Sequence, residues 1–128
     1  MKKHRFGTFI SLLAIIAACS PQKAPAAQAV ETYLRALAGK DEARLVSLTC
    51  GEWEAEALLE YDAFTLVETS LKDLDCQQTG SGGDAALVTC RGSIQATYQN
   101  EVQQFDLGGR LYRVVQQGGD WLICGYTR

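Results

Sequence analysis

The feature that most constrains the fold is a change in sequence character near Phe64. Before this residue, Val30, Tyr33, Leu34 and Leu37 fall at i, i+3, i+4 and i+7, which is one apolar stripe on a helix. After it, β-branched and aromatic residues become more frequent and glycine-rich turns separate the segments. Helices followed by strands predict an α+β domain. We expect the N-terminal helices to pack in the concave face of a curved antiparallel sheet of about four long strands.

Start and stop signals divide the helical part into three segments. Gly39 is placed to end the helix that carries the apolar stripe. Asp41 can cap a second, short helix. The acids that follow Gly51 suit the start of a third helix, which we expect over residues 52–61.

Four strands are expected in the second part of the chain. A two-residue loop at Gln99 and Asn100 is typical of a β-hairpin, and Gly108 with Gly109 indicates a bulge or bend inside a strand. The remaining turns are expected at residues 79–84 and at 118–119. These predicted turns delimit four strands, over residues 64–78, 85–98, 101–117 and 120–127.

The hairpin loop also predicts a register. If Gln99 and Asn100 form the loop, Ile94 lies opposite Phe105. Counting by twos then places five apolar residues on one face: Val88, Cys90, Ile94, Phe105 and Leu107. A slip of one residue would scatter this face, so the apolar pattern supports the register.

The first 18 residues do not fit the domain. A basic start, which includes Lys2, Lys3 and Arg5, precedes an almost unbroken apolar run that ends in small residues. This order is typical of an export signal, and the run is shorter than the roughly 20 residues that span a bilayer. We therefore expect a signal peptide over residues 1–18, a lipid-bearing tether over 19–27 and one domain over 28–128.

The end of this leader, Ile16-Ala17-Ala18-Cys19, resembles the lipobox of bacterial lipoproteins. The resemblance implies cleavage before Cys19 and a lipid on its sulfur. It also implies a stable membrane anchor, because several acyl chains anchor a protein stably whereas a single chain binds a membrane only marginally. Ser20 after the cysteine implies the periplasmic face of the outer membrane if the host has two membranes. An ordinary cleavage site after Ala26 is the alternative.

Removal of the leader changes the charge of the chain. It takes away three of the 12 basic residues and none of the 15 acidic ones, which leaves a net charge near −6. Nucleic acid is therefore not an expected partner, because it needs clustered basic residues. The leader also contains the only histidine, His4.

Four cysteines remain in the mature chain: Cys50, Cys76, Cys90 and Cys124. An even number in an exported chain predicts two disulfides, although the count alone allows three connectivities. Cys76 and Cys90 lie symmetrically about Gly83, in the middle of the first turn, so the register favours pairing them and leaves Cys50 for Cys124. Without C-x-x-C spacing or a histidine, no metal site and no cofactor is expected.

Several further side chains are candidates for binding. Glu52, Glu56 and Glu60 follow one another at i,i+4, which could form a docking face for a basic partner, a weak cation site or simply a solvated acidic face. Trp53 could line a pocket or belong to the core. Arg113, expected opposite Cys124, could contact an anion or pair with an acid.

Two longer stretches, AVETYLRALAGKDEARLVSL and YRVVQQGGDWLICGY, resemble the opening and closing elements of nuclear-transport-factor-two-like domains. The resemblance implies a cone-shaped α+β fold with a pocket between sheet and helices, but it does not imply a function. Catalytic relatives use Asp, Tyr and often His in that pocket. Here Tyr33, Tyr61, Glu52 and Asp62 are the available types near the helices.

These observations favour a membrane-anchored, exported lipoprotein whose domain binds an envelope protein or a small ligand without catalysis. The alternatives are a small-molecule pocket enzyme of the isomerase or dehydratase kind and a carrier of a hydrophobic ligand. A deep pocket with an ionisable pair would favour the enzyme, and a wide apolar cavity would favour the carrier. A filled interior together with a contiguous exposed patch would favour the binding domain.

Overall fold

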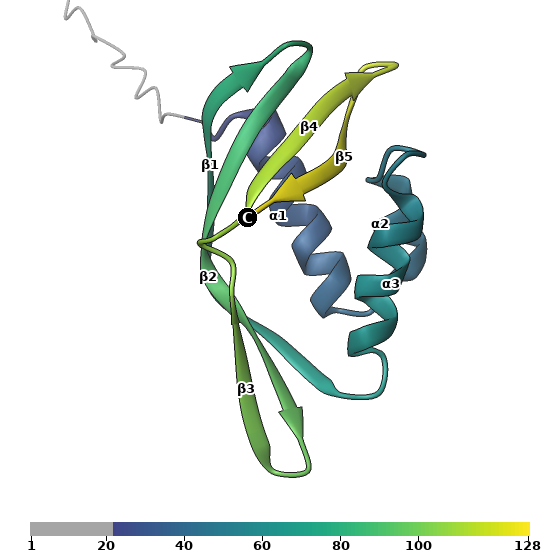
Figure 1. The fold of residues 1–128 in the computed structure, drawn as a ribbon, viewed down its shortest axis with the longest axis vertical. Coiled ribbons are helices and arrows are strands. Elements are labelled where there is room, and N and C mark those ends of the chain that lie inside the picture. Colours follow the sequence, from purple (N-terminus) through teal and green to yellow (C-terminus); the bar gives the residue numbers. More distant parts are fainter. Residues whose placement is uncertain (1–21) are drawn as a thin grey trace, which may run out of the picture.

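A computed structural model describes residues 22–128, so the predicted leader and Cys19 lie outside the described residues. Three helices come first and five strands follow, which confirms the α+β prediction (Figure 1). The helices are α1 (Pro25–Ala38), α2 (Glu42–Ser47) and α3 (Glu54–Phe64). The strands are β1 (Glu68–Gly82), β2 (Ala85–Tyr98), β3 (Glu101–Asp106), β4 (Leu111–Gln117) and β5 (Asp120–Thr127).

Helix α1 carries the predicted apolar stripe into the core. Val30, Tyr33, Leu34 and Leu37 are all fully buried. The helix begins at Pro25, where a fixed φ and a missing N–H are tolerated, so it starts inside the segment that we predicted as tether. Ala26 and Ala27, the last residues of that predicted tether, are fully buried and belong to the domain.

The other two helices are short and lie beside α1. The Asp41 side chain caps α2 by accepting a hydrogen bond from the Arg44 N–H at 3.1 Å. Helix α3 extends to Phe64, beyond the predicted end at residue 61, because the Phe64 ring packs edge-on against Phe105 at a centroid distance of 5.4 Å. Packing against the sheet therefore lengthens this helix past its local sequence signals.

The sheet is antiparallel, in the order β1-β2-β4-β5, with β3 paired to the far end of β2. It curves around the helices, which cover one of its faces (Figure 1). The single strand predicted over residues 101–117 is two strands, because the chain turns at Gly108 and Gly109 and moves from one part of β2 to another. The structure therefore has five strands where about four were predicted.

Strand β2 lies at the centre of the sheet, and its predicted register is confirmed. Ile94 pairs with Phe105, and the loop residues Gln99 and Asn100 have φ values of 46° and 71°, as a tight hairpin loop requires. The first turn is tighter than predicted, since β1 continues to Gly82 and only residues 83–84 connect it to β2. Four of the five residues predicted on one face are buried: Val88, Cys90, Ile94 and Leu107; the fifth, Phe105, is half-buried.

The outer edge of β5 is covered by the connection between α2 and α3. The Cys50 N–H donates to the Ile123 carbonyl at 3.0 Å, and the Ile123 N–H donates to the Leu48 carbonyl at 2.8 Å. Thr49 thereby forms a short parallel bridge with Ile123. Covering an edge in this way satisfies its backbone groups and removes a site for pairing with another chain.

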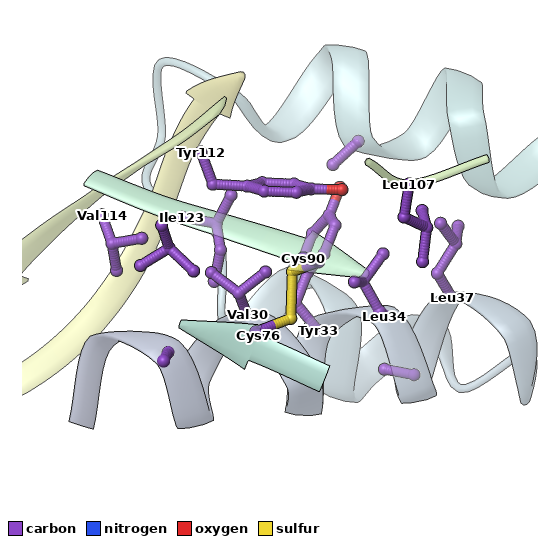
Figure 2. Packing of buried hydrophobic residues seen from close by; sticks show 14 of the residues in the cluster. Val30, Tyr33, Leu34, Leu37, Cys76, Cys90, Leu107, Tyr112, Val114 and Ile123 are labelled. Atoms are coloured by element: carbon purple, nitrogen blue, oxygen red, sulfur yellow. A yellow bond between two sulfur atoms is a disulfide. The ribbon is translucent and has the colours of Figure 1, made fainter. Parts of the chain in front are cut away.

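The core fills the space between α1 and the sheet. Figure 2 shows Tyr33 from α1 and Tyr112 from β4 pointing into the same space, beside the Cys76–Cys90 disulfide. Both tyrosines are fully buried, as are Val114 and Ile123. The concave face of the sheet is therefore occupied by side chains of the domain itself.

Candidate functional site

An ion pair between α3 and the loop before β4 forms the centre of the candidate site. Arg110 Nη1 donates to Glu60 Oε1 at 2.7 Å, and the two side chains are 7% and 14% exposed. The same Nη1 donates to the Tyr112 hydroxyl at 3.1 Å, and the guanidinium carbon lies 4.4 Å from the ring centroid of Tyr126. Since each buried charge needs its partner, this pair ties α3 to the sheet.

Two buried tyrosines beside the ion pair are protonated at neutral pH. Burial raises the pKa of Tyr33, the negative charge of Glu60 adds to the shift, and the nearby indole N–H of Trp53 opposes it. Burial also raises the pKa of Tyr112 to about 12, although the positive charge of Arg110 works against this. A neutral phenol can donate a hydrogen bond, but it is a poor general base near neutral pH.

Three buried polar atoms around the ion pair have no hydrogen-bond partner among residues 22–128. They are the Tyr33 hydroxyl, the Trp53 Nε1 and the Glu60 Oε2. The Trp53 N–H lies beside the Tyr33 hydroxyl without reaching hydrogen-bond geometry. Buried polar atoms without a protein partner cost free energy unless a buried water satisfies them.

The residue types that a pocket enzyme would need are not assembled into one accessible site. Tyr33 is fully buried, whereas Glu52 and Asp62 are exposed. The Tyr61 hydroxyl donates to the backbone carbonyl of Lys40 at 3.1 Å. Of these four candidates, only Tyr33 lies beside the ion pair.

The predicted acidic face of α3 is divided, which corrects our grouping of its three acids. Glu52 precedes the helix and is exposed, and Glu56 is exposed on the helix. Glu60 instead points inward, because it lies three residues after the buried Ala57 and four before the buried Phe64. The three acids therefore do not share one face.

Trp53 and Arg113, the other predicted binding residues, lie at one shallow hollow. Trp53 is half-buried at the start of α3, and its ring packs edge-on against Tyr126 at 5.5 Å. Gly125 leaves room for this ring, since a Cβ there would lie 3.3 Å from it. Arg113 pairs with Asp84 at 3.3 Å on the surface, so the predicted pairing with an acid is confirmed.

Three of the hollows on the surface of residues 22–128 are large enough for a small ligand. The apolar hollow, of about 300 Å³, is lined by Trp53, Leu87, Arg113 and Tyr126 among others. The N-terminal groove, of about 420 Å³, lies between the start of α1 and the β4–β5 turn. The arginine hollow, of about 340 Å³, is lined by Gln104, Phe105, Asp106, Gly109, Arg110 and Arg128. None of these three hollows is lined by Tyr33 or Glu60.

Both predicted disulfides are present. Cys76 and Cys90 are direct partners on β1 and β2, with their Cα atoms 4.0 Å apart. Cys50 is bonded to Cys124, with a Cα separation of 5.2 Å, and so joins the α2–α3 connection to the edge of the sheet. The predicted connectivity is therefore confirmed, although a register shift between Gln78 and Gly80 is needed to bring Cys76 opposite Cys90.

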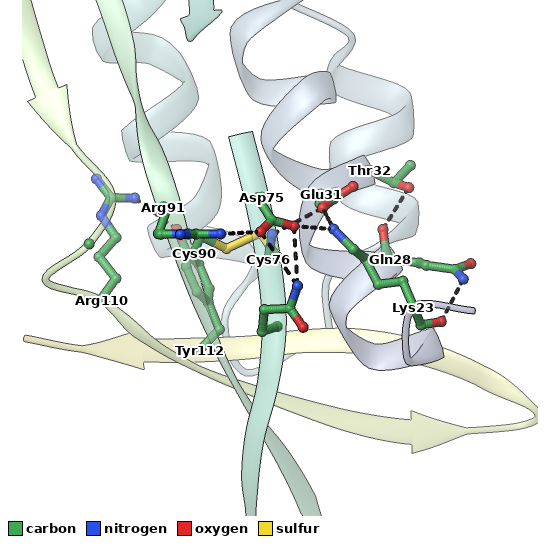
Figure 3. The surroundings of a disulfide bond; sticks show 12 residues. Lys23, Gln28, Glu31, Thr32, Asp75, Cys76, Cys90, Arg91, Arg110 and Tyr112 are labelled. Carbon is green, nitrogen blue, oxygen red and sulfur yellow. Dashed lines mark hydrogen bonds and ion pairs between the residues drawn. A yellow bond between two sulfur atoms is a disulfide. The ribbon is translucent and has the colours of Figure 1, made fainter. Parts of the chain in front are cut away.

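A charged cluster fixes the chain where it enters α1. The Lys23 ammonium contacts both Glu31 on α1 and Asp75 on β1, the latter at 2.7 Å (Figure 3). Arg91 contacts the other oxygen of Asp75 at 2.8 Å. Glu31 also accepts a hydrogen bond from the Cys76 N–H at 3.0 Å. The entry into the domain is therefore held against β1, beside a disulfide.

This cluster predicts a dependence of stability on acid pH. Hydrogen bonds from Lys23, then Arg91 and Gln77, lower the pKa of Asp75. A carboxyl whose pKa falls on folding stabilises the protein above its unfolded pKa of about 3.9, and this contribution is lost as pH falls through the lower folded pKa. Asp75→Asn should therefore flatten the decline in urea midpoint between about pH 4 and about pH 2.

The exposed Asp62 supplies the control for this prediction, because it makes no ion pair with the described part of the chain. Asp62→Asn should leave the acid decline as it is in the unchanged protein. Equal declines in the unchanged protein and in Asp75→Asn would contradict the role given to the cluster.

Within residues 22–128, no group of three or more His, Cys, Asp or Glu side chains is arranged to hold a metal ion. In the same range, no helix has the length and apolar character needed to cross a bilayer.

Comparisons with known proteins find similarity among solved structures only. The chain matches no protein-family model and no curated protein sequence. A solved structure titled Rd1NTF2_05, with five substitutions in its title, is similar to this chain at a TM-score of 0.46 and 14% identity. The similarity covers 78% of this chain and 94% of that one. What the described residues define by themselves is an α+β domain with two disulfides and a filled concave face.

Proposed function

We propose that this chain is an exported lipoprotein, anchored by lipid on Cys19, whose domain binds a partner or small ligand at the cell envelope without catalysing a reaction. In a host with two membranes, the proposed location is the periplasmic face of the outer membrane. The proposed class of domain is nuclear-transport-factor-two-like, on the strength of the sequence resemblance at its two ends.

The start of the domain supports cleavage at Cys19 over the alternative after Ala26. Cleavage after Ala26 would remove Lys23 with its two carboxylate contacts, and it would remove the fully buried Ala26 itself. Cleavage before Cys19 leaves all of these in place and adds only a few residues ahead of Lys23. The structure of the entry therefore agrees better with the lipobox site.

The two disulfides support export. Disulfides form and persist in oxidising compartments such as the periplasm and are rare in the cytosol. Here one disulfide joins paired residues of β1 and β2, and the other joins the α2–α3 connection to β5. An oxidising location is therefore the natural setting for this domain.

The observation that carries the noncatalytic part of the proposal is the filled interior. Tyr33 and Glu60 are the tyrosine and carboxylate that an isomerase-like enzyme would need, but none of the three surface hollows is lined by either residue. Burial also raises the pKa of Tyr33, so its hydroxyl stays protonated at neutral pH and is a weaker acid. A substrate in any of these three hollows would not contact the side chains of Tyr33 and Glu60 as lining residues.

Lipidation can be tested by metabolic labelling with an alkyne-bearing fatty acid in the bacterium that makes the protein. The unchanged protein should incorporate the label, and Cys19→Ser should lose it. Cys50→Ser is the matched control, since it removes a cysteine that we assign to a disulfide and should keep the label. No label on the unchanged protein, or an equal label on Cys19→Ser, would refute the proposal.

A hydrophobic carrier is the second candidate, and the apolar hollow favours it. Trp53, Leu87 and Tyr126 give this hollow apolar walls, and Arg113 also lines it. At about 300 Å³ it is at the small end of the range for ligand pockets. Binding of a fluorescent fatty acid that Leu87→Lys abolishes would support the carrier over the binding domain proposed above.

A further inference from the structure

The arginine hollow lies where the chain changes partners between β3 and β4. Its walls come from the end of β3, from the loop around Gly109 and from Arg128 after β5. Its volume of about 340 Å³ suits a small organic molecule. Phe105 gives it an aromatic wall, held in place by the edge-on contact with Phe64.

Arg110 is one of the residues that line this hollow, and only part of its hydrogen-bonding capacity is used. Its side chain is 7% exposed, and both protein hydrogen bonds, to Glu60 and to Tyr112, come from Nη1. Neither Nη2 nor Nε has an acceptor among residues 22–128, and neither is among the fully buried unpartnered atoms. Contact with the Tyr126 ring at 4.4 Å fixes the plane of the guanidinium.

The free side of a guanidinium has a specific chemical partner. Nη2 and Nε present two parallel N–H groups, which match the two oxygens of a carboxylate in a bidentate pair. A guanidinium that is already buried and oriented loses little side-chain entropy on binding. The ion pair with Glu60 therefore leaves Arg110 prepared to receive a carboxylate.

The other charges of the hollow modify this preference. Arg128 adds a second positive side chain that has no carboxylate partner among the described residues. Asp106 adds a negative one, but one of its oxygens already accepts a hydrogen bond from the Gly108 N–H at 2.8 Å. Arg128 should therefore strengthen the binding of a carboxylate and Asp106 should weaken it.

We propose that the arginine hollow binds the carboxylate of a small organic acid, with Nη2 and Nε of Arg110 holding the carboxylate and Phe105 contacting its apolar body. This inference deepens the binding function proposed above and rests on it for its biological setting. The chemistry of the hollow does not depend on lipid at Cys19, so the two proposals can fail separately.

The test uses the mature protein in lipid nanodiscs and follows benzoate by saturation-transfer NMR, with empty nanodiscs as the blank. Benzamide, which has the same shape without the charge, is the matched probe. Benzoate should bind at least about tenfold more tightly than benzamide, because hydrogen bonds between charged groups are the stronger kind. Equal binding of the two probes, or no binding of benzoate, would overturn the proposal.

Variants locate the binding without disturbing the buried ion pair. Arg128→Gln should weaken benzoate binding, and Asp106→Asn, which keeps an acceptor for Gly108, should strengthen it by about two- to fivefold. Arg35→Gln removes the same charge from a side chain that is 61% exposed on α1, outside the hollow, and should change nothing. Identical affinities in Arg128→Gln, Asp106→Asn and Arg35→Gln would place benzoate elsewhere and overturn the assignment.

Discussion

Replacing Arg110 by methionine should lower the free energy of unfolding by about 3–5 kcal/mol. Methionine keeps much of the apolar length of arginine but leaves Glu60 without its charged partner. The Glu60 side chain is only 14% exposed, and its second oxygen already has no partner among the described residues. A buried carboxylate left alone in this way is strongly unfavourable. Urea unfolding followed by circular dichroism measures the loss.

Arg113 provides the matched control for this variant. It pairs with Asp84 at 3.3 Å, but the two side chains are 45% and 75% exposed. Arg113→Met should therefore cost no more than about 1 kcal/mol, as exposed pairs do. The double variant Arg110→Met with Glu60→Gln should recover part of the loss, because it also removes the stranded charge. Equal losses for Arg110→Met and Arg113→Met would show that the first pair is not buried in solution.

Removal of the Cys50–Cys124 disulfide should lower the free energy of unfolding by about 4 kcal/mol, and removal of Cys76–Cys90 by about 3 kcal/mol. The two bonds close loops with sequence separations of 74 and 14, and a longer loop constrains the unfolded chain more. The variants replace both cysteines of a pair by alanine, which avoids placing a hydroxyl in the core. Urea unfolding of each variant, compared with the unchanged protein, gives the values.

The two disulfide variants should also differ in how fast the Ile123 amide exchanges with solvent. Loss of Cys50–Cys124 should also loosen the edge of β5, since the Ile123 backbone pairs there with the α2–α3 connection. Hydrogen exchange at the Ile123 amide should rise in that variant. In the Cys76–Cys90 variant it should rise much less, because that disulfide lies on β1 and β2. An unchanged rate at Ile123 without the Cys50–Cys124 bond would contradict the edge-covering role.

The hairpins are the part of the fold that local sequence determined best. Gln99 and Asn100 can adopt the positive φ values of a two-residue loop, and the loop then fixes which residue faces which. Ile94 consequently met Phe105 as predicted. Cys76 also met Cys90, but through a register shift between Gln78 and Gly80, because the two-residue turn alone would place Cys76 opposite Arg91. Period-two patterns determine such pairings because any slip would expose the apolar face.

The division of the third predicted strand could not be read from the sequence. Gly108 and Gly109 indicated a bend, but a bulge within one strand would use the same residues. The difference lies in long-range pairing, since β3 pairs with the second half of β2 and β4 with the first half. No local sequence pattern indicates which half of a long strand the following strand will pair with.

The candidate site was only partly visible in the sequence. Glu60 was grouped with Glu52 and Glu56 by i,i+4 spacing, although its spacing of three from Ala57 and four from Phe64 placed it on the buried face. That second pattern was a usable signal. Arg110 had no comparable signal, because its burial depends on the turn between β3 and β4 and on contact with Tyr126. Charged residues become buried through tertiary partners, which local patterns do not reveal.

The most direct measurement of the central claim is the intact mass of the mature protein extracted from membranes. We propose that the chain begins at Cys19 and carries a diacylglycerol on its sulfur, with a further acyl group on its amino terminus. The mass should therefore correspond to residues 19–128 with both disulfides closed, plus these lipids. A mass that corresponds to a chain starting at Ala27, or to one starting at Cys19 with a free thiol, would contradict the claim.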